Sequence, residues 1–206
     1  FISHSFGGGI ETYLNTKYVE LKKSGKDYIN LKVVTFADLQ YWQVSGSFYT
    51  DRYFEIGDIA GLIKWLEKRN LTSISVEHMG NASANEIYEL LKLLNKSYSL
   101  MLHDFSWVCP KINLVDQLGR YCNLRESTTC ELCVEKSNLP SPSAISFPKL
   151  GTVASLRKVS YKIIKGSTVV EAPSISTRQI YLKAFPDIDV KVKAHHRERP
   201  FKQREK

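Results

Sequence analysis

The chain has 206 residues, of which 43% are hydrophobic and 24% are charged, and its formal net charge at pH 7 is +8. This composition is typical of a folded globular protein with a substantial core, and it excludes a disordered chain. No stretch approaches the roughly 18 consecutive apolar residues of a membrane-spanning helix, and no charged-then-apolar signal segment opens the chain. We therefore expect a soluble, cytoplasmic protein.

Half of the net positive charge lies near the end of the chain, where residues 183–206 hold eight basic and four acidic side chains. We interpret residues 197–206 as a basic linker or tail; contact with anionic lipid at a membrane face and contact with nucleic acid are the alternatives. His195 and His196 precede it, either as ligand-facing residues or as the start of the linker. Since the chain lacks an initiator Met and opens in a predicted strand, we expect a segment of a longer protein.

The first fourteen residues predict a strand, a glycine turn and a helix. Phe1 and Ile2 suit a parallel strand that is buried on both faces. The three residues Gly7, Gly8 and Gly9 permit positive φ and allow a ligand to approach the backbone at the N-terminus of the next helix. The spacing differs from the dinucleotide fingerprint and from a Walker loop, so a flexible turn is the alternative.

Hydrophobic periodicity predicts the remaining elements in chain order. The expected strands are Tyr28–Phe36, a hairpin over Tyr41–Phe54, Ser73–His78, Tyr98–Leu102, Thr168–Glu171 and Asp189–Ala194. The expected helices are Ile10–Lys23, one from Ile59 to near Asn70, one from the N-cap Ser83 with Glu86 in a capping box, Thr152–Lys165 and Ser174–Phe185. The alternation predicts an α/β fold over residues 1–196: a Rossmann-like, doubly wound parallel sheet in which Phe1–His4 is a central strand.

Polar residues that follow the parallel strands are the candidate site, because such sheets bind ligands at the carboxyl ends of their strands. The binding candidates are Gly7, Gly8, Gly9, His78, Asn81, Ser106, Trp107 and Ser174. The catalytic candidates are His103 and Asp104, since an imidazole exchanges protons and a carboxylate accepts from hydroxyls. The alternative is that both cap the strand and loop structurally. We expect His103 to face an open cleft that it shares with the glycine run.

The stretch from His103 to Pro148 shows no clear periodicity, so we expect a long loop, and it contains all four cysteines. Cys130 and Cys133 form a Cys-x-x-Cys pair, and Cys109 and Cys122 lie in the same stretch with twelve residues between them. Four thiolates can close a structural zinc site, for which we expect the sulfurs to converge. Reduced free thiols and disulfides are the alternatives, and disulfides are disfavoured without an export signal.

Three groups of residues carry a resemblance to a known family. They are Phe1 to Tyr13 (FISHSFGGGIETY), His103-Asp104 with Val108-Cys109-Pro110 and Asn113-Leu114, and Ala172-Pro173-Ser174. In order and spacing they resemble the N-terminal domain of a GT-B glycosyltransferase of the retaining family-4 type, from residue 1 to about 196. The resemblance supports the clustering of the cysteines more than any metal.

The resemblance implies a two-domain enzyme of the kind that acts in polysaccharide biosynthesis. This half would bind a glycan or lipid-linked acceptor, and a second Rossmann-like domain would hold most of the nucleotide-sugar, with no cofactor or metal for the chemistry. Gly7 to Gly9 would lie beside the donor diphosphate and the acceptor, His103 would face the transferred sugar, and Ser174 would lie near the interdomain cleft. The family's two glutamates separated by seven residues have no counterpart, so we expect this chain alone to be inactive.

Two other functions fit parts of the sequence. A nucleotide-sugar epimerase would share the fold, and a basic zinc-knuckle module would bind nucleic acid. The aromatic residues are spread over the predicted core and do not form a stacking strip, so we expect no nucleic-acid partner. Binding of nucleotide-sugars compared with oligonucleotides would discriminate between these classes.

Overall fold

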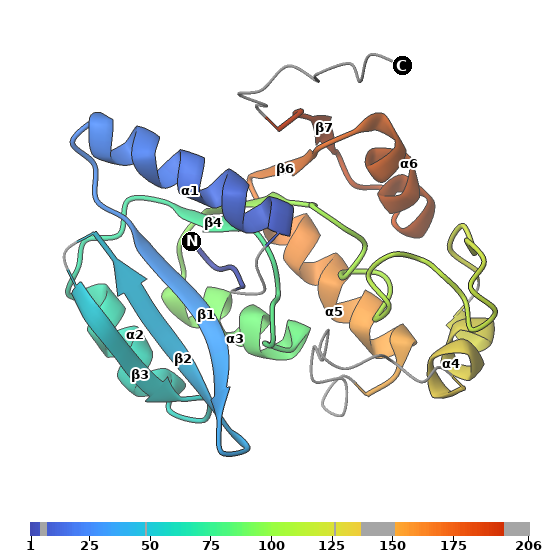
Figure 1. Cartoon of the computed structure of the whole chain (residues 1–206), viewed down its shortest axis with the longest axis horizontal. Coiled ribbons are helices and arrows are strands. Elements are labelled where there is room, and N and C mark those ends of the chain that lie inside the picture. The colour runs from blue at the N-terminus through green and yellow to red at the C-terminus, as the bar shows by residue number, and fades with distance from the viewer. Residues whose placement is uncertain (5–7, 48, 126, 137–150, 196–206) are drawn as a thin grey trace, which may run out of the picture.

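The computed structural model describes residues 1–4, 8–47, 49–125, 127–136 and 151–195. It is a mixed α/β structure in which a parallel and an antiparallel sheet lie side by side with helices around them (Figure 1). The predicted basic tail, residues 197–206, lies outside the described residues.

The elements follow one another along the chain as the periodicity predicts, with one additional helix. The strands are β1 (Ile29–Phe36), β2 (Leu39–Gly46), β3 (Tyr49–Glu55), β4 (Ile74–Val76), β5 (Tyr98–Met101), β6 (Val169–Ala172) and β7 (Lys191–Val192). The helices are α1 (Gly8–Lys23), α2 (Ile59–Glu67), α3 (Ala84–Leu94), α4 (Ser127–Glu135), α5 (Val153–Gly166) and α6 (Ile175–Ala184). Among these helices, none has both the length and the apolar character that a membrane crossing requires.

The parallel sheet has the strand order β4-β5-β6-β7. Helix α3 connects β4 to β5, helix α5 lies in the connection from β5 to β6, and helix α6 connects β6 to β7. Parallel neighbours need such crossovers, because a tight hairpin can join only antiparallel strands. The predicted alternation of strand and helix is confirmed for this half of the molecule.

The strand predicted over Tyr28–Phe36 joins the first residues of the chain in parallel, through the bridge between Ile2 and Leu31, but its other edge belongs to an antiparallel sheet. It is β1, which pairs antiparallel with β2, and β2 pairs antiparallel with β3. Ala37 and Asp38 join β1 to β2 with φ values of 45° and 66°, the left-handed backbone that suits a two-residue hairpin turn. The hairpin predicted over Tyr41–Phe54 is confirmed by β2 and β3, but the turn at Ala37 and Asp38 also sends the chain straight back along β1, so three strands form an antiparallel sheet beside the parallel one.

Ile2 joins the two sheets. It forms parallel bridges with Leu31 of β1 on one side and with Val76 of β4 on the other, and its amide donates to the Ser75 carbonyl at 2.9 Å. The predicted central place of Phe1–His4 is confirmed, although the pairing is limited to bridges. From this centre the chain first runs to β1 and later returns to β4 on the other side. The winding therefore reverses at Ile2, which is the kind of point where α/β sheets form a ligand crevice.

Helix α3 shows how local signals and packing agree. Ser83 accepts a hydrogen bond from the Glu86 amide and Glu86 returns one to the Ser83 amide, so the predicted capping box is confirmed. Ile87 and Leu90 are fully buried, where α3 packs against α2 and α5. Burial of each such side chain contributes about 1.5–3 kcal/mol, so this face anchors the helical layer.

The stretch from residue 103 to 148 is not entirely loop, as we had expected it to be. Ser127–Glu135 form α4, which packs against α5. The apolar residues of α4 form no continuous stripe, and Leu132 is exposed, so periodicity gives no signal for this helix. Contacts with α5 hold it instead, including a hydrogen bond from the Ala154 amide to the Glu131 carboxylate at 3.2 Å. Residues 137–150 lie outside the described part of the chain.

Candidate functional site

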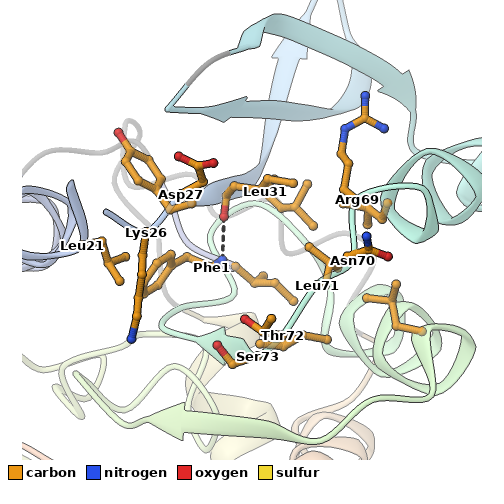
Figure 2. Close-up of a pocket in the computed structure, with 16 residues that line it drawn as sticks. Phe1, Leu21, Lys26, Asp27, Leu31, Arg69, Asn70, Leu71, Thr72 and Ser73 are labelled. Carbon is orange, nitrogen blue, oxygen red and sulfur yellow. Dashed lines mark hydrogen bonds between the residues drawn. The ribbon is translucent and has the colours of Figure 1, made fainter. Parts of the chain in front are cut away.

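A pocket of about 540 Å³ lies at the amino ends of the strands. Figure 2 shows Phe1 and Leu31 at its wall, with Leu71 and Ser73 from the segment that leads into β4. Of the predicted site residues that the structure describes, none lines this pocket. The side chains that can carry chemistry lie at the opposite ends of the strands, where α/β sheets bind their ligands.

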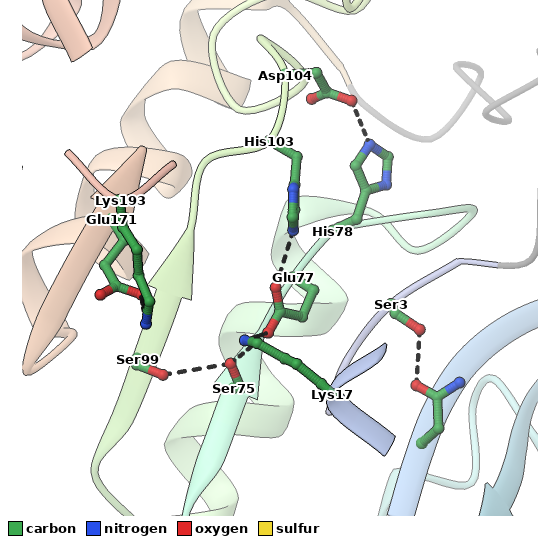
Figure 3. A network of polar contacts seen from close by, with 11 residues as sticks. Ser3, Lys17, Ser75, Glu77, His78, Ser99, His103, Asp104, Glu171 and Lys193 are labelled. Carbon is green, nitrogen blue, oxygen red and sulfur yellow. Dashed lines mark hydrogen bonds and ion pairs between the residues drawn. The ribbon is translucent and has the colours of Figure 1, made fainter. Parts of the chain in front are cut away.

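Glu77 is the centre of a buried polar network at the carboxyl end of β4 (Figure 3). Its side chain is 0% exposed and accepts hydrogen bonds from Lys17 Nζ at 3.0 Å, Ser75 Oγ at 2.7 Å and His103 Nε2 at 2.9 Å. Burial alone would raise the pKa of Glu77, but the His103 hydrogen bond and the Lys17 charge outweigh it and lower the pKa to about 2. Glu77 is therefore an ionised carboxylate inside the protein.

His78 and Asp104 form a second pair beside this network. His78 Nδ1 accepts a hydrogen bond from the Gly80 amide at 2.7 Å, so the proton of the neutral ring lies on Nε2, 2.8 Å from Asp104 Oδ2. Asp104 also accepts from the Ser106 amide at 2.8 Å. Burial would raise the pKa of Asp104, but the hydrogen bond from His78 outweighs it and lowers the pKa to about 2. Asp104 thus holds the orientation of the His78 ring.

Gly80 allows the His78 loop to approach the first residues of the chain. Its φ is +60°, and a Cβ at this position would lie 3.1 Å from both the Ser3 carbonyl oxygen and His4 Cβ. The His4 ring meets the His78 ring edge to face, with centroids 4.6 Å apart. Burial and the neighbouring His78 lower the pKa of His4 to about 4, so its ring is neutral at pH 7.

The ring of His103 is enclosed. Its side chain is 1% exposed, and it lies edge to face against Tyr13 of α1, with centroids 5.1 Å apart. His195 stacks on Tyr13 at 4.5 Å and lies 4.9 Å from the His103 ring. The expected open cleft in front of His103 is therefore wrong for the described residues, because α1 and the chain after β7 close over the ring.

A polar pocket of about 250 Å³ lies next to the network, between α1 and the antiparallel sheet. Ser3 and His4 line it from the centre of the molecule, and Ser3 Oγ donates to Asn30 Oδ1 at 2.7 Å. Tyr18 and Tyr28 belong to its lining and stack with centroids 4.0 Å apart. Further polar lining residues are Glu11, Asn15, Lys32, Ser45 and Asp51. This pocket contains hydroxyl, amide, carboxylate and ammonium groups, and His4 connects it to His78.

The predicted binding residues lie in different parts of the structure. His78 belongs to the network, whereas Asn81 faces the antiparallel sheet, with its Nδ2 3.5 Å from the Val33 carbonyl. Trp107 is 1% exposed and packs in the hydrophobic core, so the predicted aromatic face for a ligand is wrong. Ser174 caps α6 by accepting from the Thr177 amide at 3.1 Å.

The structure describes only part of the run Gly7 to Gly9 and only the first of the two adjacent histidines, His195 and His196. Gly8 and Gly9 are the first residues of α1, whereas Gly7 lies outside the described residues. Helix α1 therefore begins earlier than predicted, before Ile10. His195 contributes to the enclosure of His103, and His196 lies outside the described part of the chain.

None of the four cysteines forms a disulfide. Cys130 and Cys133 lie one turn apart on α4 and not in a loop knuckle, because this segment is helical. Arg157 donates to Cys130 Sγ at 3.2 Å and to the Val108 carbonyl at 2.9 Å, which holds α4 close to Cys109. Within the described ranges, no three side chains of the metal-binding types form a group that could hold an ion. The zinc site with Cys122 as a fourth ligand therefore stays a prediction.

Lys17, Glu77 and Tyr13 were not among the predicted site residues. Glu77 directly precedes His78 at the end of a strand, and a charged residue at such a position was an available signal. Lys17 and Tyr13 lie four residues apart on α1, so they share a face of that helix. Only the packing of α1 across the strand ends shows that this face points at Glu77 and His103.

Comparison of the chain with family models, with curated proteins and with solved structures finds no match. The functional argument therefore depends on the residues and their geometry.

Proposed function

We propose that this chain is the acceptor-binding half of a glycosyltransferase that transfers a sugar from a nucleotide-sugar to a glycan or a lipid-linked acceptor. One observation carries the proposal: the polar pocket opens beside His4, next to two histidine–carboxylate pairs at the point where the winding reverses. The parallel sheet and its crossovers agree with a Rossmann-like domain of the GT-B type.

The groups in the polar pocket suit an acceptor sugar. A sugar presents many hydroxyls that both donate and accept, and Asn15 and Asn30 do the same through their amides. Glu11 and Asp51 supply acceptors, and Lys32 supplies a donor. The stacked tyrosines of this pocket add an aromatic wall against which the apolar face of a sugar ring can pack.

We propose that a second domain binds most of the nucleotide-sugar donor. The first turn of α1, with Gly8 and Gly9, would offer backbone amides and the positive end of the helix to the donor diphosphate. The chain lacks the paired glutamates that the resembled family uses for the donor sugar, so we expect it to transfer no sugar alone. Residues 197–206 would then be a basic linker, with peripheral contact to a membrane face as the second interpretation.

The alternatives receive less support. A nucleic-acid module would stack bases on a strip of exposed aromatic rings, but Trp42 and Trp107 are buried in the core, and the exposed rings of Phe36 and Tyr53 pack edge to face against each other. An epimerase would need its own dinucleotide-binding turn, and the run Gly7 to Gly9 does not have that spacing. Metal analysis of the purified chain would decide between a structural zinc at the cysteines and free thiols.

Binding experiments on the ¹⁵N-labelled chain test the proposal. The probes are short glycans, nucleotide-sugars with UDP, GDP and dTDP, and oligonucleotides of random sequence. We expect glycans to shift the amide signals of Asn15, Asn30 and Lys32, and we expect no turnover with any nucleotide-sugar. Binding of oligonucleotides alone, or sugar transfer by residues 1–206, would contradict the proposal.

A further inference from the structure

The two nitrogens of the His103 ring have different partners. Nε2 lies 2.9 Å from a carboxylate oxygen of Glu77, and this carboxylate is ionised and accepts only. Nε2 must therefore carry the proton of a neutral ring. Nδ1 is buried and has no hydrogen-bond partner among the described residues.

An unpartnered nitrogen at this depth needs an explanation, because a buried polar atom without a hydrogen bond is unfavourable. The rings of Tyr13 and His195 pack against the His103 ring, and Nε2 of His195 is likewise buried without a partner in the described part of the chain. Two unpartnered ring nitrogens therefore lie in one niche, which is typical of a place that receives a polar group.

We propose that Glu77 is a positioning residue that holds neutral His103 as the Nε2–H tautomer, so that Nδ1 accepts a hydrogen bond from a ligand hydroxyl. Lys17 balances the charge of Glu77 at 3.0 Å, and Ser75 occupies a further lone pair of the carboxylate. The ring of His103 then needs no second proton to neutralise Glu77. The choice of a sugar hydroxyl as the donor rests on the proposed function; the tautomer does not.

The geometry separates this arrangement from an ordinary buried ion pair. In a simple ion pair, a protonated His103 would itself supply the positive charge that balances Glu77. Here Lys17 Nζ already supplies that charge at the other oxygen of the carboxylate. His78 gives an internal comparison, because its Nδ1 is bound to the Gly80 amide and is not free for a ligand. Of these two rings, His103 alone therefore presents an acceptor nitrogen to the niche.

Long-range ¹H–¹⁵N NMR of the full ¹⁵N-labelled chain reads the tautomer directly. His103→Gln assigns the ring signals by their loss. We expect the wild-type ring to show Nε2–H and a bare Nδ1 at neutral pH. A ring that is protonated on Nδ1, or on both nitrogens, would overturn the proposal.

Variants show whether Glu77 and Lys17 set this state. We expect Glu77→Gln to remove the preference for Nε2–H, and Lys17→Met to shift His103 toward the doubly protonated ring, because Glu77 then lacks its other cation. Glu171→Gln is the matched control, since it removes the more exposed pair of Lys193 and Glu171, 3.1 Å apart, on the neighbouring strands. If Glu77→Gln fails to fold, Lys17→Met and the wild type decide; unchanged ring signals in Lys17→Met would refute the positioning role.

Titration with methyl glucoside, methyl galactoside and methyl mannoside tests the acceptor role of Nδ1. We expect a binding glycoside to move the Nδ1 signal of His103 and to leave its Nε2–H in place. Shifts in the amides of the polar pocket without a shift at Nδ1 would refute the hydroxyl site and leave the proposed function standing. No response to any of the three sugars would count against the hydroxyl site, whereas the tautomer would be judged by the ligand-free spectrum.

Discussion

Two pockets of the described structure have opposite character. At the amino ends, the pocket of about 540 Å³ is lined in large part by apolar side chains such as Phe1 and Leu31. A smaller pocket of about 250 Å³ lies between α1 and the antiparallel sheet and is lined mainly by polar groups; its His4 packs on His78, which bonds to Asp104 at the carboxyl ends. The larger volume therefore does not mark the chemistry, because the ionised carboxylates of Glu77 and Asp104 and their histidine partners lie at the carboxyl ends of the strands, away from it.

The largest expected difference between the two ends concerns stability. Glu77→Ala leaves Lys17 and His103 without their shared acceptor, and loss of one partner from a buried pair costs about 3–5 kcal/mol in the free energy of unfolding. Thr72→Ala at the amino-end pocket changes an exposed side chain and is expected to stay within about 0.5 kcal/mol. Urea unfolding measures both. A cost below about 1 kcal/mol for Glu77→Ala would mean that the network is not a stabilising centre.

His4, which lines the polar pocket, is expected to make the stability of the protein depend on pH. The unfolded state takes up a proton near pH 6.5, whereas burial lowers the pKa of His4 in the folded protein to about 4. The contribution of neutral His4 to the free energy of unfolding is therefore complete above pH 6.5. It is lost as the pH falls toward 4, by roughly 3 kcal/mol in all. Thermal unfolding from pH 7 to pH 4 measures this slope, and His4→Gln should flatten it. An equal slope in His4→Gln would assign the effect to other groups.

A smaller effect is expected for ligand affinity. Asn15→Ala removes one amide from the polar pocket at an exposed position of α1, so we expect the affinity for a bound glycan to fall about 2- to 10-fold with unchanged stability. Thr72→Ala is the control at the amino-end pocket and should leave the affinity unchanged. Calorimetric titration measures both variants. Equal losses of glycan affinity in the two variants would remove the distinction between the two pockets.

The smallest expected effect separates the cysteines by reactivity. Burial raises the pKa of Cys109 to about 11, so its thiolate is scarce at pH 8, whereas Cys122, Cys130 and Cys133 are only half-buried. Under native conditions we expect Cys109 to react most slowly with a disulfide reagent, as followed by mass spectrometry of the modified peptides. Fast modification of Cys109 would show that its loop opens readily.

Local sequence signals predicted the helices well. The capping box at Ser83 and the stripe of α3 are contacts between residues three or four apart, and a sequence displays such contacts directly. Helix α4 was missed because contacts with α5, including the hydrogen bond of Arg157 to Cys130, replace the apolar stripe that a helix of this length normally shows. Its existence depends on residues distant in sequence.

Strand pairing was predicted for the parallel strands and for the hairpin of β2 and β3, but not for β1 with β2. Strand–helix–strand spacing indicates parallel neighbours, and β4 to β7 follow that rule. The pairing of β1 with β2 depends on the turn at Ala37 and Asp38, whose residues are not the Asn-Gly or Asp-Gly pair that announces such a hairpin. The turn between β1 and β2 therefore gave too weak a sequence signal for this pairing to be predicted.

The sequence by itself determined which strand ends supply the polar groups of the site. His78, His103 and Asp104 each follow a buried parallel strand, and the carboxyl ends of such strands meet at one edge of the sheet. Only the tertiary structure decided what these groups do. Lys17 reaches Glu77 across sixty positions of the chain, and Tyr13 and His195 close over His103. The charge balance of Glu77 and the enclosure of His103 arise from the packing of α1 over the sheet. Local sequence does not indicate which distant side chains this packing brings to the strand ends.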